Sequence, residues 1–242
     1  MALEKNLDLI RSGLGRDAEV LGAQDATPIP ELWRNYLDSS DASRMRALTD
    51  EMRDMADYFP QAAQRVLDVA SDVVVVKTGE LGVCRVIVVD LNGKQFLRFS
   101  RAPLRYQPED WNNEVTDLLL TRAPDAIKYL YSEMMNGFTD PYNFVGFKNT
   151  AVIRTVEQEI DGFAELESYE KIEALGDQNK VVELLSSGGG GSLLLDLNKD
   201  WRSNTDPTGV RVADDDSDAD TVPLFATLDA WIAIGLGQEQ PS

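Results

Sequence analysis

The sequence contains no histidine and a single cysteine, Cys84. Without a second cysteine the chain cannot form an internal disulfide, which suits a reducing compartment. Without histidine it has no Ser–His or Cys–His nucleophile pair, no histidine zinc ligand and no imidazole for acid–base chemistry. Walker A, Rossmann and EF-hand motifs are also missing. We therefore expect a protein that is not an enzyme and that binds neither a metal nor another cofactor.

Long hydrophobic runs are absent too. The clearest apolar stretches, at 73–76 and 86–89, have the length of strands and fall far short of the ~18 residues of a membrane helix. The N-terminal stretch MALEKNLDLIRSGLG has no basic segment followed by an apolar core, so we expect no signal peptide. These absences predict a cytoplasmic protein with no membrane partner.

Basic residues are scarce relative to acidic ones. The 242 residues include 42 Asp and Glu against 23 Lys and Arg, a formal net charge of −19. Such a surface repels nucleic acid and anionic membranes, so neither is an expected partner. Residues 111–242 hold 24 acids and 9 bases, whereas residues 1–110 hold 18 acids and 14 bases. The excess of acids in residues 111–242 would attract a basic protein partner. The same composition also occurs in proteins whose acidity only keeps them soluble.

Residues 1–107 favour helices followed by a small antiparallel sheet, and they resemble no family. A helix over 42–58 is predicted, because apolar residues recur on one face: Met45, Leu48, Met52 and Met55. Three runs then predict strands at 73–76, 83–90 and 95–99, and the pair Asn92-Gly93 predicts a hairpin turn between the last two. A basic cluster ends this region, and we expect it to be a solvated strand end that pairs with local acids: Arg98, Arg101 and Arg105.

Residues 108–242 begin with helical patterns at 109–120 and after Pro124. Asn136 and Gly137 are expected to end the second helix as a C-cap, because both tolerate the left-handed conformation. A strand is predicted at 151–156. Four glycines then separate two apolar strand patterns, and we expect them to form a hairpin turn that holds no ligand: Gly188, Gly189, Gly190 and Gly191.

The order of these features resembles that of the SUKH superfamily over about residues 111–242. The matching pieces are a Pro-helix-Asn-Gly segment, a glycine turn, a strand ending Leu-Asp-Leu, a Val-containing strand, an acidic turn and a terminal helix. In this chain they are Pro124, Asn136-Gly137, Gly188 to Gly191, Leu195-Asp196-Leu197, Val210-Arg211-Val212, and Phe225 with Trp231. The chain departs from the pattern in an acidic insert at 157–177 and in its separate first half.

The resemblance implies an α+β fold for the C-terminal half, with a twisted and mainly antiparallel sheet and flanking helices. The helical and β-hairpin N-terminal region predicted from residue patterns precedes it. Bacterial members are immunity proteins that neutralise a cognate polymorphic or contact-dependent toxin in the producer's cytoplasm, and fungal members are related to regulators of cell-wall synthesis. A toxin partner is therefore expected, a basic nuclease being one such class. A non-catalytic scaffold or regulatory binding module of the same fold is the alternative.

The densest acidic segments of the second half are the expected toxin-binding sites. They are Asp214, Asp215, Asp216, Asp218 and Asp220 in a predicted loop, and Glu157, Glu159, Asp161 and Glu165 in the insert. A third hypothesis, a hydrolase that uses the carboxylates of Asp196 and Asp200, lacks a third group to complete a site. We also expect two structural units, 1–107 and 108–242, because the charge balance shifts between them. One sheet continuous through both would argue against that division.

Overall fold

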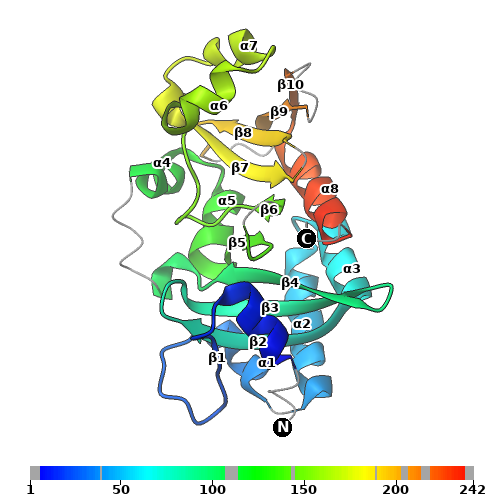
Figure 1. The fold of residues 1–242 in the computed structure, drawn as a ribbon. Coiled ribbons are helices and arrows are strands. Elements are labelled where there is room, and N and C mark those ends of the chain that lie inside the picture. The colour runs from blue at the N-terminus through cyan, green and yellow to red at the C-terminus, as the bar shows by residue number, and fades with distance from the viewer. Residues whose placement is uncertain are drawn as a thin grey trace.

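The structure is a computed structural model that describes residues 6–38, 40–106, 114–142, 145–188, 190–202, 207–213 and 219–237. The strands of these residues form one ten-stranded antiparallel sheet in which each strand pairs with the next along the chain (Figure 1). The strands are β1 (Glu19–Val20), β2 (Ala70–Thr78), β3 (Gly82–Leu91), β4 (Lys94–Arg101), β5 (Asn136–Thr139), β6 (Val145–Phe147), β7 (Val181–Ser187), β8 (Ser192–Asp196), β9 (Thr208–Val212) and β10 (Ala219–Pro223). The expected α+β class is confirmed.

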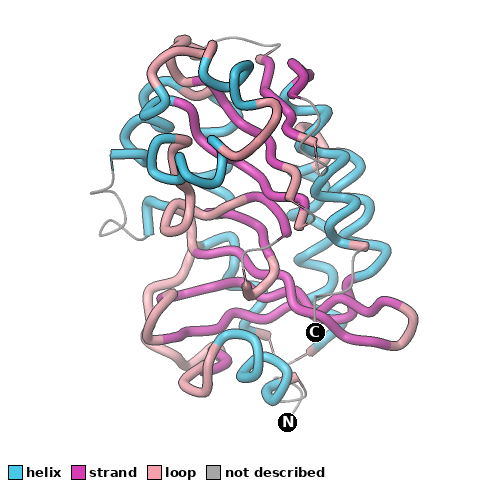
Figure 2. Tube along the Cα trace, turned by 45° about the horizontal axis from the view of Figure 1, so that its top comes forward, coloured by secondary structure: helices cyan, strands magenta, loops and turns pink. Residues whose placement is uncertain are grey.

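Helices cover both sides of the first strands, and a layer of longer helices lies along one face of the sheet (Figures 1 and 2). The α-helices are α1 (Leu7–Leu14), α2 (Asp41–Met55), α3 (Pro60–Val69), α4 (Glu114–Arg122), α5 (Asp125–Tyr129), α6 (Ile160–Ala164), α7 (Tyr169–Glu173) and α8 (Leu224–Leu236). Shorter helical turns are η1 (Glu31–Leu37), η2 (Leu104–Tyr106), η4 (Leu130–Met134), η5 (Glu157–Glu159) and η6 (Gln178–Lys180).

The valine run of β2 shows how an unbroken apolar stretch becomes a strand. Successive side chains point to opposite faces of a sheet. Val73 and Val75 accordingly join the large core beneath α2 and α3, whereas Val74 and Val76 join a second core beneath α1. Both faces of β2 are buried along this run, so apolar residues occupy successive positions. Cys84 belongs to the second core and is fully buried, as expected.

The helix and hairpin predictions of the first half are confirmed. The predicted helix over 42–58 is α2, and three residues of its apolar stripe are buried: Leu48, Met52 and Met55. Asn92 and Gly93, with φ of 55° and 80°, connect β3 and β4 as the predicted hairpin.

The N-terminus of α3 takes its cap from a distant helix. Phe59 precedes Pro60 at the start of α3 and supplies no side-chain cap. Asp229 of α8 instead accepts hydrogen bonds from the backbone N–H groups of Gln61 and Ala62, at 3.1 and 2.7 Å. Asp229 is only 3% exposed. The exposed N–H groups and the dipole at a helix N-terminus favour a carboxylate there, so α8 and α3 are joined by charge as well as by packing.

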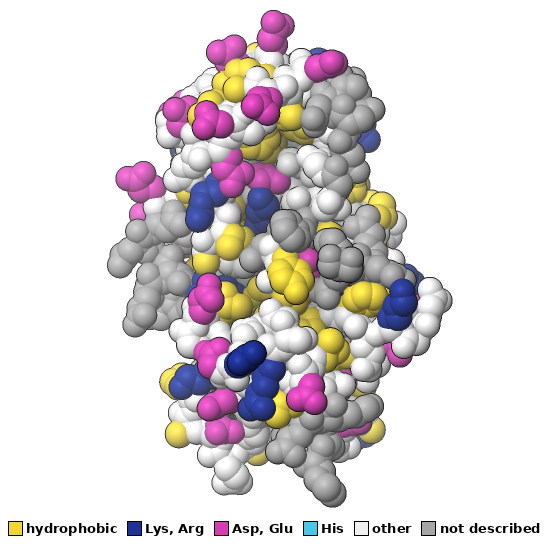
Figure 3. Space-filling model, viewed as in Figure 1, with side chains coloured by type: hydrophobic (Ala, Val, Ile, Leu, Met, Phe, Trp, Pro, Cys, Tyr) yellow, Lys and Arg dark blue, Asp and Glu magenta, His cyan; other side chains and the backbone are white. Residues whose placement is uncertain are grey.

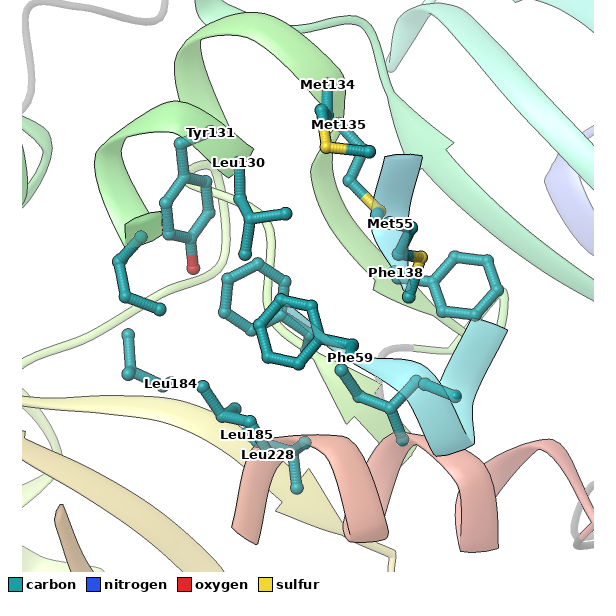
Figure 4. Close-up of a cluster of buried hydrophobic side chains, with 14 of the residues drawn as sticks. Met55, Phe59, Leu130, Tyr131, Met134, Met135, Phe138, Leu184, Leu185 and Leu228 are labelled. Carbon is teal, nitrogen blue, oxygen red and sulfur yellow. The ribbon is translucent and has the colours of Figure 1, made fainter. Parts of the chain in front are cut away.

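The two expected units share one sheet and one core. Strand β4 pairs with β5 through Phe99–Thr139 and Arg101–Asn136. The largest core contains Met55 of α2, Phe138 of β5 and Leu228 of α8, and Figure 4 shows their side chains converging. This continuity argues against separately folded units at 1–107 and 108–242. The sheet is likewise not confined to the C-terminal half.

Asn136 and Gly137 do not cap a helix, which corrects the prediction. The helix that begins after Pro124 ends in the π-helical turn η4, and both residues lie in β5. Asn136 is fully buried and exchanges two 2.8 Å hydrogen bonds with Thr150, one to its hydroxyl and one from its backbone N–H. Gly137 has φ of +81°, and a Cβ there would stand 2.5 Å from Asn149. The segment predicted as a strand at 151–156 is mostly turn, with one isolated bridge from Thr155 to Val182.

The predicted basic cluster is not a solvated strand end. Arg98 and Arg101 are 2% and 6% exposed, whereas Arg105 is exposed and pairs with Glu133. The guanidinium of Arg98 donates to the backbone oxygen of Gly235 in α8, at 2.7 Å. Burial lowers the pKa of Arg98, and the charge of Asp140 opposes that effect. Arg98 therefore holds the sheet against α8.

Two buried ion pairs fix α2 to the sheet. Arg44 is fully buried and donates to Asp72 of β2 at 2.7 Å. Glu51 forms an ion pair with Arg85 of β3 and also accepts the hydroxyl hydrogen of Tyr36. Burial lowers the pKa of Arg85, and it raises the pKa of Tyr36. These contacts set the position of α2 by charge, because a shifted helix would leave buried charges unpaired.

Candidate binding surface

The acidic insert forms a small layer of helices over the far end of the sheet. We call residues 157–177, which comprise η5, α6 and α7, the acidic cap (Figure 1). Phe163 of α6 and Ile172 of α7 are buried in a third core, together with Val181 of β7 and Val212 of β9. Buried apolar side chains therefore attach the acidic cap to the sheet.

Charge of one sign dominates the acidic cap. Its sequence contains eight acids and one base, Lys171. All eight acids are exposed: Glu157, Glu159, Asp161, Glu165, Glu167, Glu170, Glu173 and Asp177. Figure 3 shows acidic side chains gathered at this end of the molecule, with hydrophobic side chains between them. A hydrogen bond from Lys180 lowers the pKa of Asp177. The cap presents carboxylates in solvent, where a cationic surface can approach them.

The structure brings the acidic insert and Asp220 of the second predicted segment toward one end of the sheet. The side chain of Lys171 in α7 donates to the backbone oxygen of Ala219 in β10, at 3.2 Å. This contact places the cap beside the strand that carries Asp220, which pairs with Arg211 of β9 at 2.7 Å. The rest of the predicted loop lies outside the described residues: Asp214, Asp215, Asp216 and Asp218.

Half-buried apolar residues lie among the carboxylates of the cap. Ile160, Leu166, Tyr169 and Leu175 pack against the third core and remain partly exposed. Sequence patterns indicated the acids of this segment but not Tyr169, although an aromatic residue within an acidic helical segment was a visible signal. Interfaces combine apolar anchors with a charged rim, and the cap contains both.

The four glycines connect paired strands. Strands β7 and β8 pair antiparallel up to Ser186 and Ser192, and the backbone N–H of Ser187 donates to Gly191 at 2.9 Å. Gly188 and Gly190 have φ of 81° and 107°. The predicted hairpin is confirmed, and Gly189 lies outside the described residues.

Changing Gly188 and Gly190 together to alanine should lower the free energy of unfolding by about 1–2 kcal/mol per site, because side chains disfavour positive φ. Urea unfolding would measure the loss. Gly162→Ala is the matched control: a Cβ at Gly162 meets nothing within 4 Å and its φ is not positive, so stability should hold or rise. If Gly162→Ala lowered the free energy of unfolding as much per site as the changes at Gly188 and Gly190, the conformational explanation would be wrong.

The two carboxylates of the hydrolase hypothesis have local structural partners. Asp196 is 4% exposed and accepts hydrogen bonds from the backbone and side-chain nitrogens of Asn198, both at 3.0 Å. Asp200 binds Arg202, whose hydrogen bonds lower the pKa of Asp200 to about 2. A carboxyl with that pKa stays ionised at neutral pH and is a poor general acid.

Comparison with family models, curated proteins and solved structures gave no match. Within the described residues, no group of three or more His, Cys, Asp or Glu side chains could hold a metal ion. No helix in the described part of the chain has both the length and the apolar character needed to cross a membrane. The geometry of the acidic cap is therefore the main structural observation that bears on function.

Proposed function

We propose that this protein is a cytoplasmic immunity protein that binds and neutralises a cognate toxin domain through its acidic cap. The observation that supports this proposal is the charge of the cap, where eight exposed acids accompany one base. The resemblance to the SUKH superfamily, in the order of motifs from Pro124 to Trp231, supports the same role. The function is binding rather than catalysis.

A basic nuclease is the toxin class that the cap fits best. A nuclease must attract phosphates, so its active cleft is basic, and carboxylates presented to that cleft compete with nucleic acid. Opposite charges also speed the encounter of two proteins and select against acidic partners. The half-buried apolar residues of the cap, with Tyr169 among them, would then supply short-range affinity.

Co-expression with the toxin encoded by the adjacent gene tests the function. We expect the chain to bind the toxin and to restore growth. If it neither binds the toxin nor restores growth, the immunity proposal fails. A toxin gene directly upstream is the simplest supporting observation, whereas an isolated gene would favour the scaffold or regulatory module.

Neutralising the cap tests the site separately. Replacing Glu157, Glu159, Asp161 and Glu165 with Gln or Asn should slow association about tenfold at low salt and flatten its salt dependence, because rim charges act mainly on the association rate. Stopped-flow association over a salt series would measure both effects. The control replaces four exposed acids of the first half: Asp8, Glu19, Glu31 and Glu80. If association is unchanged, or if the control slows it equally, this site assignment fails while the immunity function stands.

A further inference from the structure

Two exposed tyrosines contact one another on the helical side of the molecule. Tyr58, just after α2, and Tyr129, at the end of α5, are 41% and 44% exposed. Their ring centroids are 6.1 Å apart and their planes are inclined by 38°. The two rings form a small exposed aromatic patch, and tyrosine is enriched in binding hot spots.

The core holds both rings in place. Phe59 follows Tyr58 and is 1% exposed, and its ring lies 6.2 Å from that of Phe225 in α8. Leu130 and Tyr131 follow Tyr129 and are 2% and 1% exposed. The hydroxyl of Tyr131 also donates to the backbone oxygen of Lys148 at 2.8 Å. The backbone beside each exposed ring is thus anchored, so a ligand would find the pair already formed.

Exposed acidic residues lie near both tyrosines in the sequence. Asp54 precedes Tyr58 by four residues and Asp57 is its neighbour, and both are exposed with no ion pair to any described residue. Asp125 precedes Tyr129 by four residues and lies on the same face of α5. Its exposed carboxylate is 3.2 Å from the ammonium nitrogen of Lys128. The pair therefore combines aromatic faces with negative charge.

We propose that the pair of Tyr58 and Tyr129 is a docking site for an arginine side chain of a protein partner. A guanidinium is planar, stacks on aromatic rings and can donate to carboxylates at the same time. A lysine ammonium is compact and strongly hydrated, so it gains less from the rings. The site differs from the acidic cap because it selects arginine over lysine, and it does not depend on the toxin-binding role.

The test compares two capped five-residue peptides in which glycine alternates with a cationic residue. One peptide contains two arginines and the other contains two lysines. Affinities of the full chain for both peptides would be measured by calorimetry at low salt. We expect the arginine peptide to bind at least about threefold more tightly, in keeping with cation–π contacts at exposed sites. The acidic cap attracts both peptides as well, so a comparison with tyrosine variants is needed to assign the preference to the tyrosine site.

The variant Tyr58→Ala/Tyr129→Ala should reduce that ratio to about one. Tyr58→Leu/Tyr129→Leu keeps apolar bulk without a π face and should do the same, which separates stacking from loss of folding. The matched control is Tyr142→Ala, because Tyr142 is 54% exposed and should leave the preference intact. An absent preference in the original chain, its survival in both double variants, or its equal loss in the control would overturn the proposal.

Discussion

Replacing Glu51 with glutamine should lower the free energy of unfolding by about 3–5 kcal/mol, the range for removing one partner of a buried ion pair. Glu51 and Arg85 are 2% and 1% exposed, so the variant would leave the guanidinium buried without its carboxylate. The ring of Trp33 lies 5.6 Å from that guanidinium and can offset only part of the loss. Urea unfolding followed by circular dichroism would measure the change.

Asp50→Asn is the matched control, since its ion pair with Arg53 is 72% exposed on both sides and should contribute less than about 1 kcal/mol. Replacing both buried partners, as Glu51→Leu with Arg85→Met, should recover most of the stability, because no buried charge is then left unpaired. If the double replacement is as unstable as Glu51→Gln, packing around α2 rather than charge explains the loss.

Replacing Asp229 with asparagine should have the second large effect and lower the free energy of unfolding by about 1–3 kcal/mol. The carboxylate caps two N–H groups of α3 and faces the positive end of that helix, whereas an amide carries no charge and has one acceptor oxygen. Thermal and urea unfolding would both report the change. Asp68→Asn, near the other end of α3 and exposed, should be neutral or slightly stabilising. A loss at Asp68 as large as that at Asp229 would rule out the capping explanation.

Local patterns predicted the elements whose determinants lie within a few residues. The Asn-Gly dipeptide, which occurs twice, shows the limit of such local patterns. Asn92-Gly93 is an exposed turn, as predicted, whereas Asn136-Gly137 is a buried part of β5. The difference comes from Asn149 and Thr150, which surround the second pair and which no local pattern connects to it.

The candidate sites show the same division. The charge of the acidic cap follows from counting residues, so the sequence alone indicated Glu157 to Glu165. The contact between Tyr58 and Tyr129 joins the turn after α2 to α5, which are distant in the chain, so it could be found only from the fold. The burial of Arg98 beneath α8 was missed for the same reason: a run of arginines looks solvated until its tertiary partner is known.

The position of α8 has a consequence for synthesis on the ribosome. Strands β2–β4 and helices α2 and α3 are made early, yet the cap of α3 comes from Asp229 and the acceptor for Arg98 comes from Gly235. A nascent chain that has not reached α8 has an uncapped helix, a buried arginine without that acceptor and an exposed side of its methionine- and phenylalanine-rich core. Such intermediates are the species that aggregate or engage chaperones. Translation must therefore deliver α8 before the first helices can complete their packing.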